Sequence, residues 1–198
     1  MRLGILLSGR GSNFLAIADS ISAGRLDAEI AVVLSNKPYA PGIEAAQQRG
    51  FHTHVVQAKG TPREQHDAEV IRTLQHHGID LVVLAGYMRL LTPEFIRAFP
   101  NKIVNIHPSL LPAFPGLDAQ KQALDYGVKI TGCTVHFVSE GLDDGPIILQ
   151  KEVPVLERDT EETLSARILK QEHIAYSEAL QLIASGRVRI VGRRVEVA

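Results

Sequence analysis

Short apolar runs alternate with segments of helical periodicity along the first half of the chain. Continuous apolar runs are typical of strands buried on both faces, and strands that alternate with helices predict a doubly wound, mainly parallel α/β sheet. Thr61 and Glu64 have the spacing of a capping box, with Pro62 at the first helical position. The expected strands are residues 2–7, 29–34, 52–56, 81–85 and 103–106, and the expected helices are residues 12–23, 42–49 and 62–77.

The pattern changes after residue 128, where two extended runs flank a polar turn. Residues 129–138 and 146–155, joined by the turn at 139–145, predict an antiparallel addition to the sheet. A long helical window over 160–185 and a terminal hairpin over 188–197 follow. No repeat, low-complexity tract or linker interrupts the chain, so we expect a single domain.

The composition is ordinary for a globular protein, with 45% hydrophobic residues, 22% charged residues and a formal net charge of −1. This balance gives no general electrostatic case for binding nucleic acid or a membrane. The single cysteine, Cys133, excludes an intramolecular disulfide and a multi-cysteine zinc site, and we expect it to be a small buried hydrophobe. The apolar stretch after Met1 is too short for a signal peptide or a membrane span, which favours a cytoplasmic protein.

Two short polar segments carry the most informative side chains. Asn105 and His107 lie two residues apart at the end of the apolar run 103–106, so on an extended backbone they point to the same side. Open α/β sheets place their ligands at such strand ends. An amide donor beside an imidazole can bind a carbonyl oxygen and handle a proton next to it. Asp143, on a turn 36 residues further along, is a carboxylate that could orient the imidazole.

The segment Ser8-Gly9-Arg10-Gly11-Ser12-Asn13 joins the first predicted strand to the first predicted helix. Its glycines let the backbone turn tightly, and free N–H groups at the following helix N-terminus favour an anion such as phosphate. The segment is neither a dinucleotide fingerprint nor a Walker loop, because the third glycine and the Gly-Lys-Ser/Thr are missing. The residues alone leave two interpretations open, a phosphate site or a tight turn before a capped helix.

Three motifs together resemble those of the folate-dependent formyltransferases. They are the loop at residues 8–13, the segment Asn105-Ile106-His107-Pro108-Ser109-Leu110-Leu111-Pro112, and the stretch from Gly132 to Pro146 with its Asp143-x-Gly145 pattern. The match runs in order and at family spacing over essentially the whole chain. It implies a Rossmann-like formyltransferase fold, and transfer of the formyl group of 10-formyltetrahydrofolate, as cosubstrate, to the amine of glycinamide ribonucleotide in purine synthesis.

The resemblance also assigns residues within one domain, 1–198. It implies a half over 1–100 that binds the phosphate and ribonucleotide, and a half over 101–198 that binds folate and carries catalysis. Thr134 is implied to support a water at the site. The implied catalytic residues are Asn105, His107 and Asp143, the implied ribonucleotide-binding residues are Gly11, Ser12, Asn13 and Glu172, and the implied folate-binding residues are Arg63, Met88, Arg89, Leu90, Leu91, Ser139, Glu140, Gly141, Leu142 and Asp143.

The implied chemistry suits these residue types. A neutral amine attacks the formyl carbon, and negative charge develops on the formyl oxygen. Asn105 can donate a hydrogen bond to that oxygen and protonated His107 can stabilise it, and one donor of this kind contributes about 3–4 kcal/mol. Asp143 favours the imidazolium and can accept the amine proton through a water. The set contains no nucleophile and needs no metal, which favours direct transfer through a tetrahedral intermediate.

Several of these side chains also have purely structural interpretations. Asn105 could satisfy loop backbone and Asp143 could be a turn residue, although the Asp-x-Gly pattern selects Asp143 rather than its neighbour. His136 lies in an apolar run and is expected to be buried and hydrogen-bonded. His52 and His54 share a strand face, but no third zinc ligand is evident. His76 and His77 lie at a predicted helix end, where they are expected to interact favourably with the helix dipole. Asp118 stands at a position where members of the family commonly have His.

Other functions remain open on the sequence. A formyltetrahydrofolate hydrolase would use water as the acceptor, and a non-enzymatic folate or nucleotide-binding protein could keep the fold without the chemistry. A methionyl-tRNA formyltransferase would need a further C-terminal domain and a basic RNA surface. We expect small-molecule substrates rather than nucleic acid or membrane as partners, and a homodimer is left open.

Overall fold

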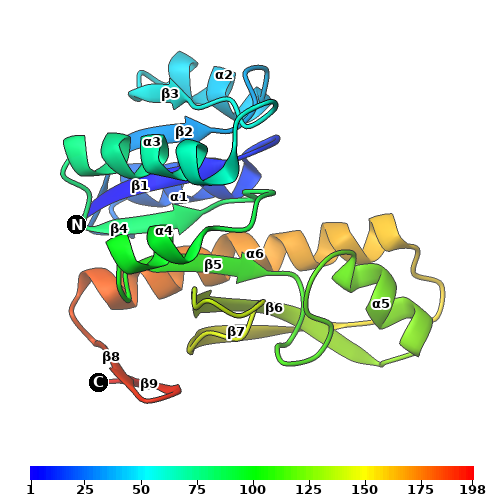
Figure 1. Ribbon diagram of the computed structural model, residues 1–198. Coiled ribbons are helices and arrows are strands. Elements are labelled where there is room, and N and C mark those ends of the chain that lie inside the picture. The colour runs from blue at the N-terminus through cyan, green and yellow to red at the C-terminus, as the bar shows by residue number, and fades with distance from the viewer. The chain divides into compact units, whose positions relative to one another are not determined.

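Parallel strands in the order β3-β2-β1-β4 form the sheet of the first structural unit, Met1–Val104 (Figure 1). The computed structural model describes residues 1–198. The strands fall on the apolar runs that predicted them. The elements are β1 (Arg2–Leu7), α1 (Ser12–Ser22), β2 (Glu29–Ser35), α2 (Pro41–Gln48), β3 (Thr53–Val55), α3 (Arg63–His76), β4 (Leu81–Leu84) and α4 (Pro93–Ala98).

The first unit is doubly wound because the strand order reverses beside β1. The chain moves outward through β2 and β3 and returns to place β4 on the other side of β1. Right-handed crossovers put α1 and α2 on one face of the sheet and α3 on the other, and Figure 1 shows α1 behind the strands and α3 in front of them. Every residue of β1 after Arg2 is consequently buried.

The second unit, Asn105–Ala198, has the strand order β5-β6-β7, in which β6 and β7 are antiparallel. The boundary between the units falls inside β5. The predicted antiparallel addition and terminal hairpin are confirmed, and so is the predicted α/β fold class. The elements are β5 (Ile103–His107), α5 (Ala119–Tyr126), β6 (Ile130–Phe137), β7 (Ile147–Pro154), α6 (Glu161–Ala184), β8 (Val188–Val191) and β9 (Arg194–Val197).

The long helix α6 packs against β6, β7 and α5. Its N-terminus is a capping box, in which Thr160 Oγ1 accepts from the Thr163 N–H and Thr163 Oγ1 accepts from the Thr160 N–H. Its buried residues recur at helical spacing and form one stripe along the helix. The stripe consists of Leu164, Ile168, Glu172, Ala175, Tyr176, Ala179 and Leu180.

The predicted capping box at Thr61 is wrong. Pro62 has an extended backbone (φ −53°, ψ 144°) and is itself the N-cap residue, so the first helical residue is Arg63. Thr61 therefore lies one position too early to cap, and its hydroxyl donates instead to the Gln57 carbonyl at 3.0 Å. The sequence analysis also omitted the short helices α4 and α5.

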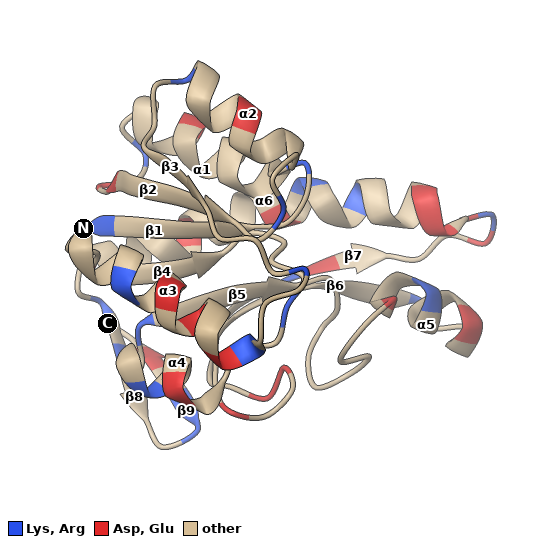
Figure 2. Ribbon diagram, turned by 45° about the horizontal axis from the view of Figure 1, so that its top comes forward, with Lys and Arg blue, Asp and Glu red and all other residues tan.

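No helix of the protein is both long enough and apolar enough to cross a membrane. Figure 2 shows that basic and acidic residues are interspersed along the elements, α6 included, rather than gathered into a stripe of one sign. This distribution agrees with the net charge of −1.

Candidate active site

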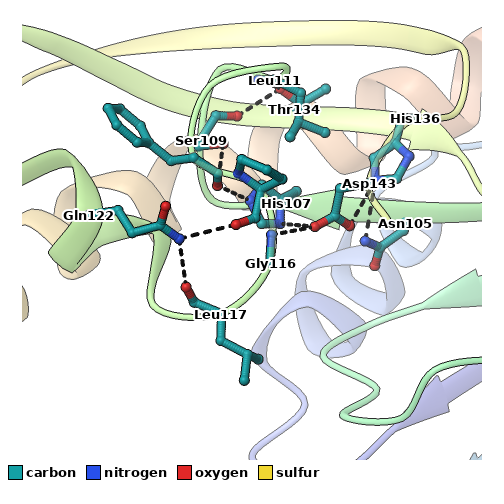
Figure 3. A network of polar contacts seen from close by, with 12 residues as sticks. Asn105, His107, Ser109, Leu111, Gly116, Leu117, Gln122, Thr134, His136 and Asp143 are labelled. Atoms are coloured by element: carbon teal, nitrogen blue, oxygen red, sulfur yellow. Dashed lines mark hydrogen bonds and ion pairs between the residues drawn. The ribbon is translucent and has the colours of Figure 1, made fainter. Parts of the chain in front are cut away.

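The imidazole of His107 lies between two oxygen acceptors in the second unit (Figure 3). Its Nε2 is 2.8 Å from the carbonyl oxygen of Phe114, and its Nδ1 is 3.3 Å from Oδ2 of Asp143. A carbonyl oxygen can only accept, so Nε2 carries a proton. The ring donates to both neighbours only as the imidazolium, because the neutral ring has a single N–H.

Asp143 is held in this position by its own backbone and by a loop amide. Its φ of +50° lies in the left-handed region, which aspartate tolerates better than most residues. The backbone N–H of Gly116 donates to Oδ2 at 2.8 Å. Asp144 faces elsewhere, because its carboxylate accepts from the hydroxyl of Ser139. The expected register, with Asp143 rather than Asp144 against His107, is confirmed as geometry.

Asn105 is oriented by His136. Nδ1 of His136 is 2.9 Å from the Phe137 carbonyl oxygen and therefore carries the proton of the neutral ring. Burial is the main cause that lowers the pKa of His136, which favours that neutral form. Its Nε2 then presents a lone pair to Nδ2 of Asn105, 3.3 Å away. This contact turns the Asn105 amide nitrogen toward the His136 ring. The second N–H of the Asn105 amide remains available to a ligand.

The prediction that His136 is buried and hydrogen-bonded is confirmed. Its contact with Asn105 was not foreseen. The alternation along β6 contained a signal, since Thr134 and His136 are two residues apart on one strand and point to the same side. Asp143 Oδ1 is also 3.9 Å from His136 Nε2, so the carboxylate lies between the two histidines.

Thr134 holds the loop that follows β5. Its hydroxyl donates to the carbonyl oxygen of Ser109 at 2.7 Å. It accepts from the backbone N–H of Leu111 at 3.0 Å and from Nε2 of Gln150 at 2.9 Å. A hydroxyl has one proton and two lone pairs, so these contacts use its full capacity. The supporting role of Thr134 is therefore to fix the loop, and no capacity is left for a site water.

Gln150 was not identified from the sequence. Its amide nitrogen donates both to Thr134 and to the Leu111 carbonyl oxygen, the latter at 2.9 Å. Thr134 and Gln150 are opposite each other in the antiparallel pairing of β6 with β7. Only this pairing brings Gln150 to the loop. The register of β6 against β7 could not be predicted from the sequence, so Gln150 was missed.

The first unit presents the loop from Ser8 to Asn13 at the carboxyl end of β1. Gly11 has φ +70° and immediately precedes α1. A Cβ on Gly11 would lie 3.0 Å from the Cα of Gly42, so the close approach of α1 to α2 requires glycine there. The backbone N–H of Gly42 donates to the Gly9 carbonyl oxygen at 3.0 Å. The loop is thus braced by α2, while the first N–H groups of α1 have no partner within the helix.

Half of the folate-matching residues, Arg63 and the segment from Met88 to Leu91, also lie in the first unit. Nε and Nη2 of Arg63 donate to the carbonyl oxygens of Leu90 and Leu91, so this guanidinium holds the segment in place. Met88 and Leu90 are 69% and 65% exposed, large fractions for apolar side chains, and are available to a flat apolar ligand. The Ser139–Asp143 turn lies in the second unit, and Glu172 lies on α6 of that unit.

The structure contains no group of three or more His, Cys, Asp or Glu side chains placed to hold a metal ion. Cys133 is fully buried, as predicted, and burial raises the pKa of its thiol to about 12.

The chain belongs to the formyl transferase family, whose model matches residues 1–180. It is 42% identical over 191 residues to the phosphoribosylglycinamide formyltransferase of Escherichia coli, which covers 96% of this chain and 90% of that protein. A solved structure, glycinamide ribonucleotide transformylase 1 from Symbiobacterium toebii, is 53% identical with a TM-score of 0.97, covering 100% of this chain and 93% of that one.

Other relatives are much longer. The trifunctional purine biosynthetic protein adenosine-3 of Drosophila melanogaster is 46% identical over 192 residues, covering 96% of this chain. The chain spans only 14% of that protein's length. A fold and a family are therefore shared with proteins that differ widely in what else they contain.

Proposed function

We propose that the chain transfers the formyl group of 10-formyltetrahydrofolate to the amine of N1-(5-phosphoribosyl)glycinamide, a step of purine biosynthesis. The observation that carries the proposal is the His107 imidazole held between the Phe114 carbonyl and the Asp143 carboxylate, beside the Asn105 amide. Family membership and the names of the relatives support the same reaction.

The reaction forms one bond and breaks another. The substrate amine attacks the formyl carbon, and the tetrahedral intermediate collapses with loss of the folate nitrogen. The Asn105 N–H that does not face His136 can donate to the developing oxyanion. The Nε2–H of His107, now donated to Phe114, is the donor that a formyl oxygen would take over. Donors fixed in advance at a water-poor site are the most effective contribution to such a step.

Proton movements fall to Asp143. Its carboxylate, 3.3 Å from Nδ1 of His107, can accept the proton that the attacking amine loses, through a water. The protonated Asp143 carboxyl can then return that proton, through a water, to the departing folate nitrogen as its bond to the formyl carbon breaks. No side chain at the site is placed as a nucleophile, so direct transfer is the simplest route.

The two units would supply different parts of the substrates. In the first unit, Gly11, Ser12 and Asn13 would bind the ribonucleotide phosphate at the start of α1, and the segment from Met88 to Leu91 would contact folate. In the second unit, Glu172 would contact the ribonucleotide, and the turn Ser139–Asp143 would contact the pterin.

The test is a turnover assay with purified protein, formyl-folate and the ribonucleotide amine. We expect tetrahydrofolate to form only when the amine is present, in equal amount to the formylated product. Formate release without the amine would instead indicate a hydrolase, and binding of both ligands without turnover would indicate a binding protein. Ser12→Ala should raise the KM for the ribonucleotide about tenfold and leave that for folate unchanged, since one phosphate donor is lost.

A further inference from the structure

Residues 88–92, here called the 88–92 segment, lead from β4 to α4 without helix or strand structure of their own. The segment includes Met88 and Leu90, whose exposed side chains would contact folate. Where the main chain forms neither ladder nor helix, its polar groups are held by side chains or by water. The side chains that bind this segment therefore decide where it presents Met88 and Leu90.

The N-terminal part of α3 supplies three of these hydrogen bonds. Arg63 donates to the carbonyl oxygens of Leu90 and Leu91. One turn further along the helix, Oδ2 of Asp67 accepts from the backbone N–H of Thr92 at 2.8 Å. Arg63 and Asp67 are four residues apart and so lie on the same face of α3. Because Thr92 is the N-cap residue of α4, Asp67 fixes the point at which the segment ends and α4 begins.

The Asp67 carboxylate is itself oriented by His66. Both side chains are buried, at 1% and 0% exposed. Nε2 of His66 is 3.0 Å from the carbonyl oxygen of Val56 and therefore carries a proton, while Nδ1 is 3.2 Å from Oδ1 of Asp67. Val56 directly follows β3. A continuous series of hydrogen bonds thus joins the end of β3, through His66 and Asp67, to the start of α4.

Stability alone does not account for a buried carboxylate at this place. Taking a charge out of water is costly, and an apolar side chain of similar size would fill the volume without that cost. Only an acceptor such as Asp67 can bind the buried Thr92 N–H and so direct the main chain. Burial, and after it the charge of Asp67, raises the pKa of Tyr87, which places the carboxylate close to the residue before the segment as well.

We propose that Asp67, oriented by His66, is a positioning residue for folate, which holds the 88–92 segment so that Met88 and Leu90 meet the ligand. Neither Asp67 nor His66 is among the residues that match the folate site of the family. The identity of the ligand rests on the proposed function, whereas the hold on the segment does not. Since Asp67 touches no reacting group, its loss should weaken folate binding and leave the chemical step unchanged.

Three variants separate the acceptor from the charge and from general stability. Asp67→Ala removes the acceptor, and Asp67→Leu does so while filling the volume, in case the alanine variant does not fold. In Asp67→Asn, Oδ1 can still accept from Thr92 while the amide nitrogen donates to Nδ1 of a neutral His66 ring. The stability control is Leu74→Val, because Leu74 packs on Gly4 of β1, about two turns further along α3.

The hold on the segment is measured in ligand-free protein by amide hydrogen exchange followed by NMR. The exchange rate of the Thr92 amide is divided by that of the β1 amides, which report opening of the whole unit. We expect this ratio to rise about tenfold in Asp67→Ala, because the Thr92 N–H has lost its acceptor. The ratio should stay at the parent value in Asp67→Asn and in Leu74→Val.

The consequence for the ligand is measured by calorimetry with folic acid and by steady-state kinetics. Asp67→Ala should bind folic acid about tenfold more weakly and raise the KM for formyl-folate to the same extent. Its kcat and its KM for the ribonucleotide should change less than about twofold, since only folate binding is affected. Asp67→Asn and Leu74→Val should both remain close to the parent protein.

An unchanged Thr92 exchange ratio in Asp67→Ala would overturn the proposal, and so would faster exchange with undiminished folic acid binding. A binding loss that Leu74→Val shares would be an effect of lower stability, and one that Asp67→Asn shares would belong to the charge; either result also contradicts the proposal. A parent protein that binds no folic acid would count against the proposed reaction. The exchange ratio would then still decide whether Asp67 holds the segment.

Discussion

Thr134 and Gln150 are cross-strand partners whose side chains meet at 2.9 Å, and together they hold the loop that carries Ser109 and Leu111. The loop begins two residues after His107, so its anchorage also fixes where the imidazole lies. The antiparallel strand β7 thereby contributes to a site to which it supplies no reacting group.

Thr134→Val should lower both the free energy of unfolding and kcat. The change keeps the shape of the side chain but leaves the buried Leu111 N–H without its acceptor, which costs about 1–3 kcal/mol. We expect kcat to fall about tenfold with little change in KM, because the imidazole loses its fixed position. Urea unfolding and steady-state kinetics measure the two effects. Thr134→Ser keeps the hydroxyl and should retain most of kcat; equal loss in both variants would show that packing rather than hydrogen bonding matters.

The tandem aspartates should differ sharply. Asp143→Asn removes the charge beside His107 while asparagine still tolerates the left-handed backbone, so folding is preserved. We expect kcat to fall about a hundredfold, as for loss of a major electrostatic group. Asp144→Asn, which only alters the contact with Ser139, is the matched control and should stay near the parent value. A larger defect in Asp144→Asn would transfer the role to that residue.

Asn105→Ala and His107→Ala should each lower kcat strongly, and the double variant should be little worse than either single one. Both groups would act on the same developing oxyanion, and groups that act as a unit are not additive. A double-mutant cycle on kcat measures the coupling. Losses that simply multiply would argue for independent roles, and normal turnover in one single variant would remove that residue from the mechanism.

The buried His136 should make stability depend on pH. Burial lowers its folded pKa below 6.5, so as pH falls the unfolded chain binds the proton first. Its contribution is therefore complete above pH 6.5 and is lost as pH falls toward the folded pKa, by up to about 1.4 kcal/mol per pH unit. His136→Gln should show a smaller drop in the free energy of unfolding between pH 7.5 and 5.5. An equal drop in both proteins would mean that other groups cause it.

The sequence predicted those features that depend on local pattern. Continuous apolar runs located the strands, and the change of pattern after residue 128 located the antiparallel pair. Thr61 was misjudged because capping depends on the backbone of Pro62, which the spacing alone does not reveal. The two-residue spacing of Asn105 and His107 at a strand end was enough to predict that their side chains point to the same side.

What the sequence could not show were contacts that depend on register or on main-chain atoms. Gln150 reaches the active-site loop only through the pairing of β6 with β7. Phe114 contacts His107 through its carbonyl oxygen. Every residue has this atom, so no sequence motif can identify it. Lys37, Lys59 and Arg89, which are far apart in the sequence, likewise line one pocket of the first unit.

The Phe114 carbonyl has a consequence for how this chain can vary. Because the acceptor for His107 belongs to the main chain, exchanging the side chain at position 114 leaves it in place, and glycine or asparagine would suit the φ of +53°. An inserted or deleted residue between Pro112 and Gly116 would instead carry the carbonyl away. The segment should therefore tolerate substitutions at position 114 but not insertions or deletions. Mutagenesis that only exchanges single residues would not detect this constraint.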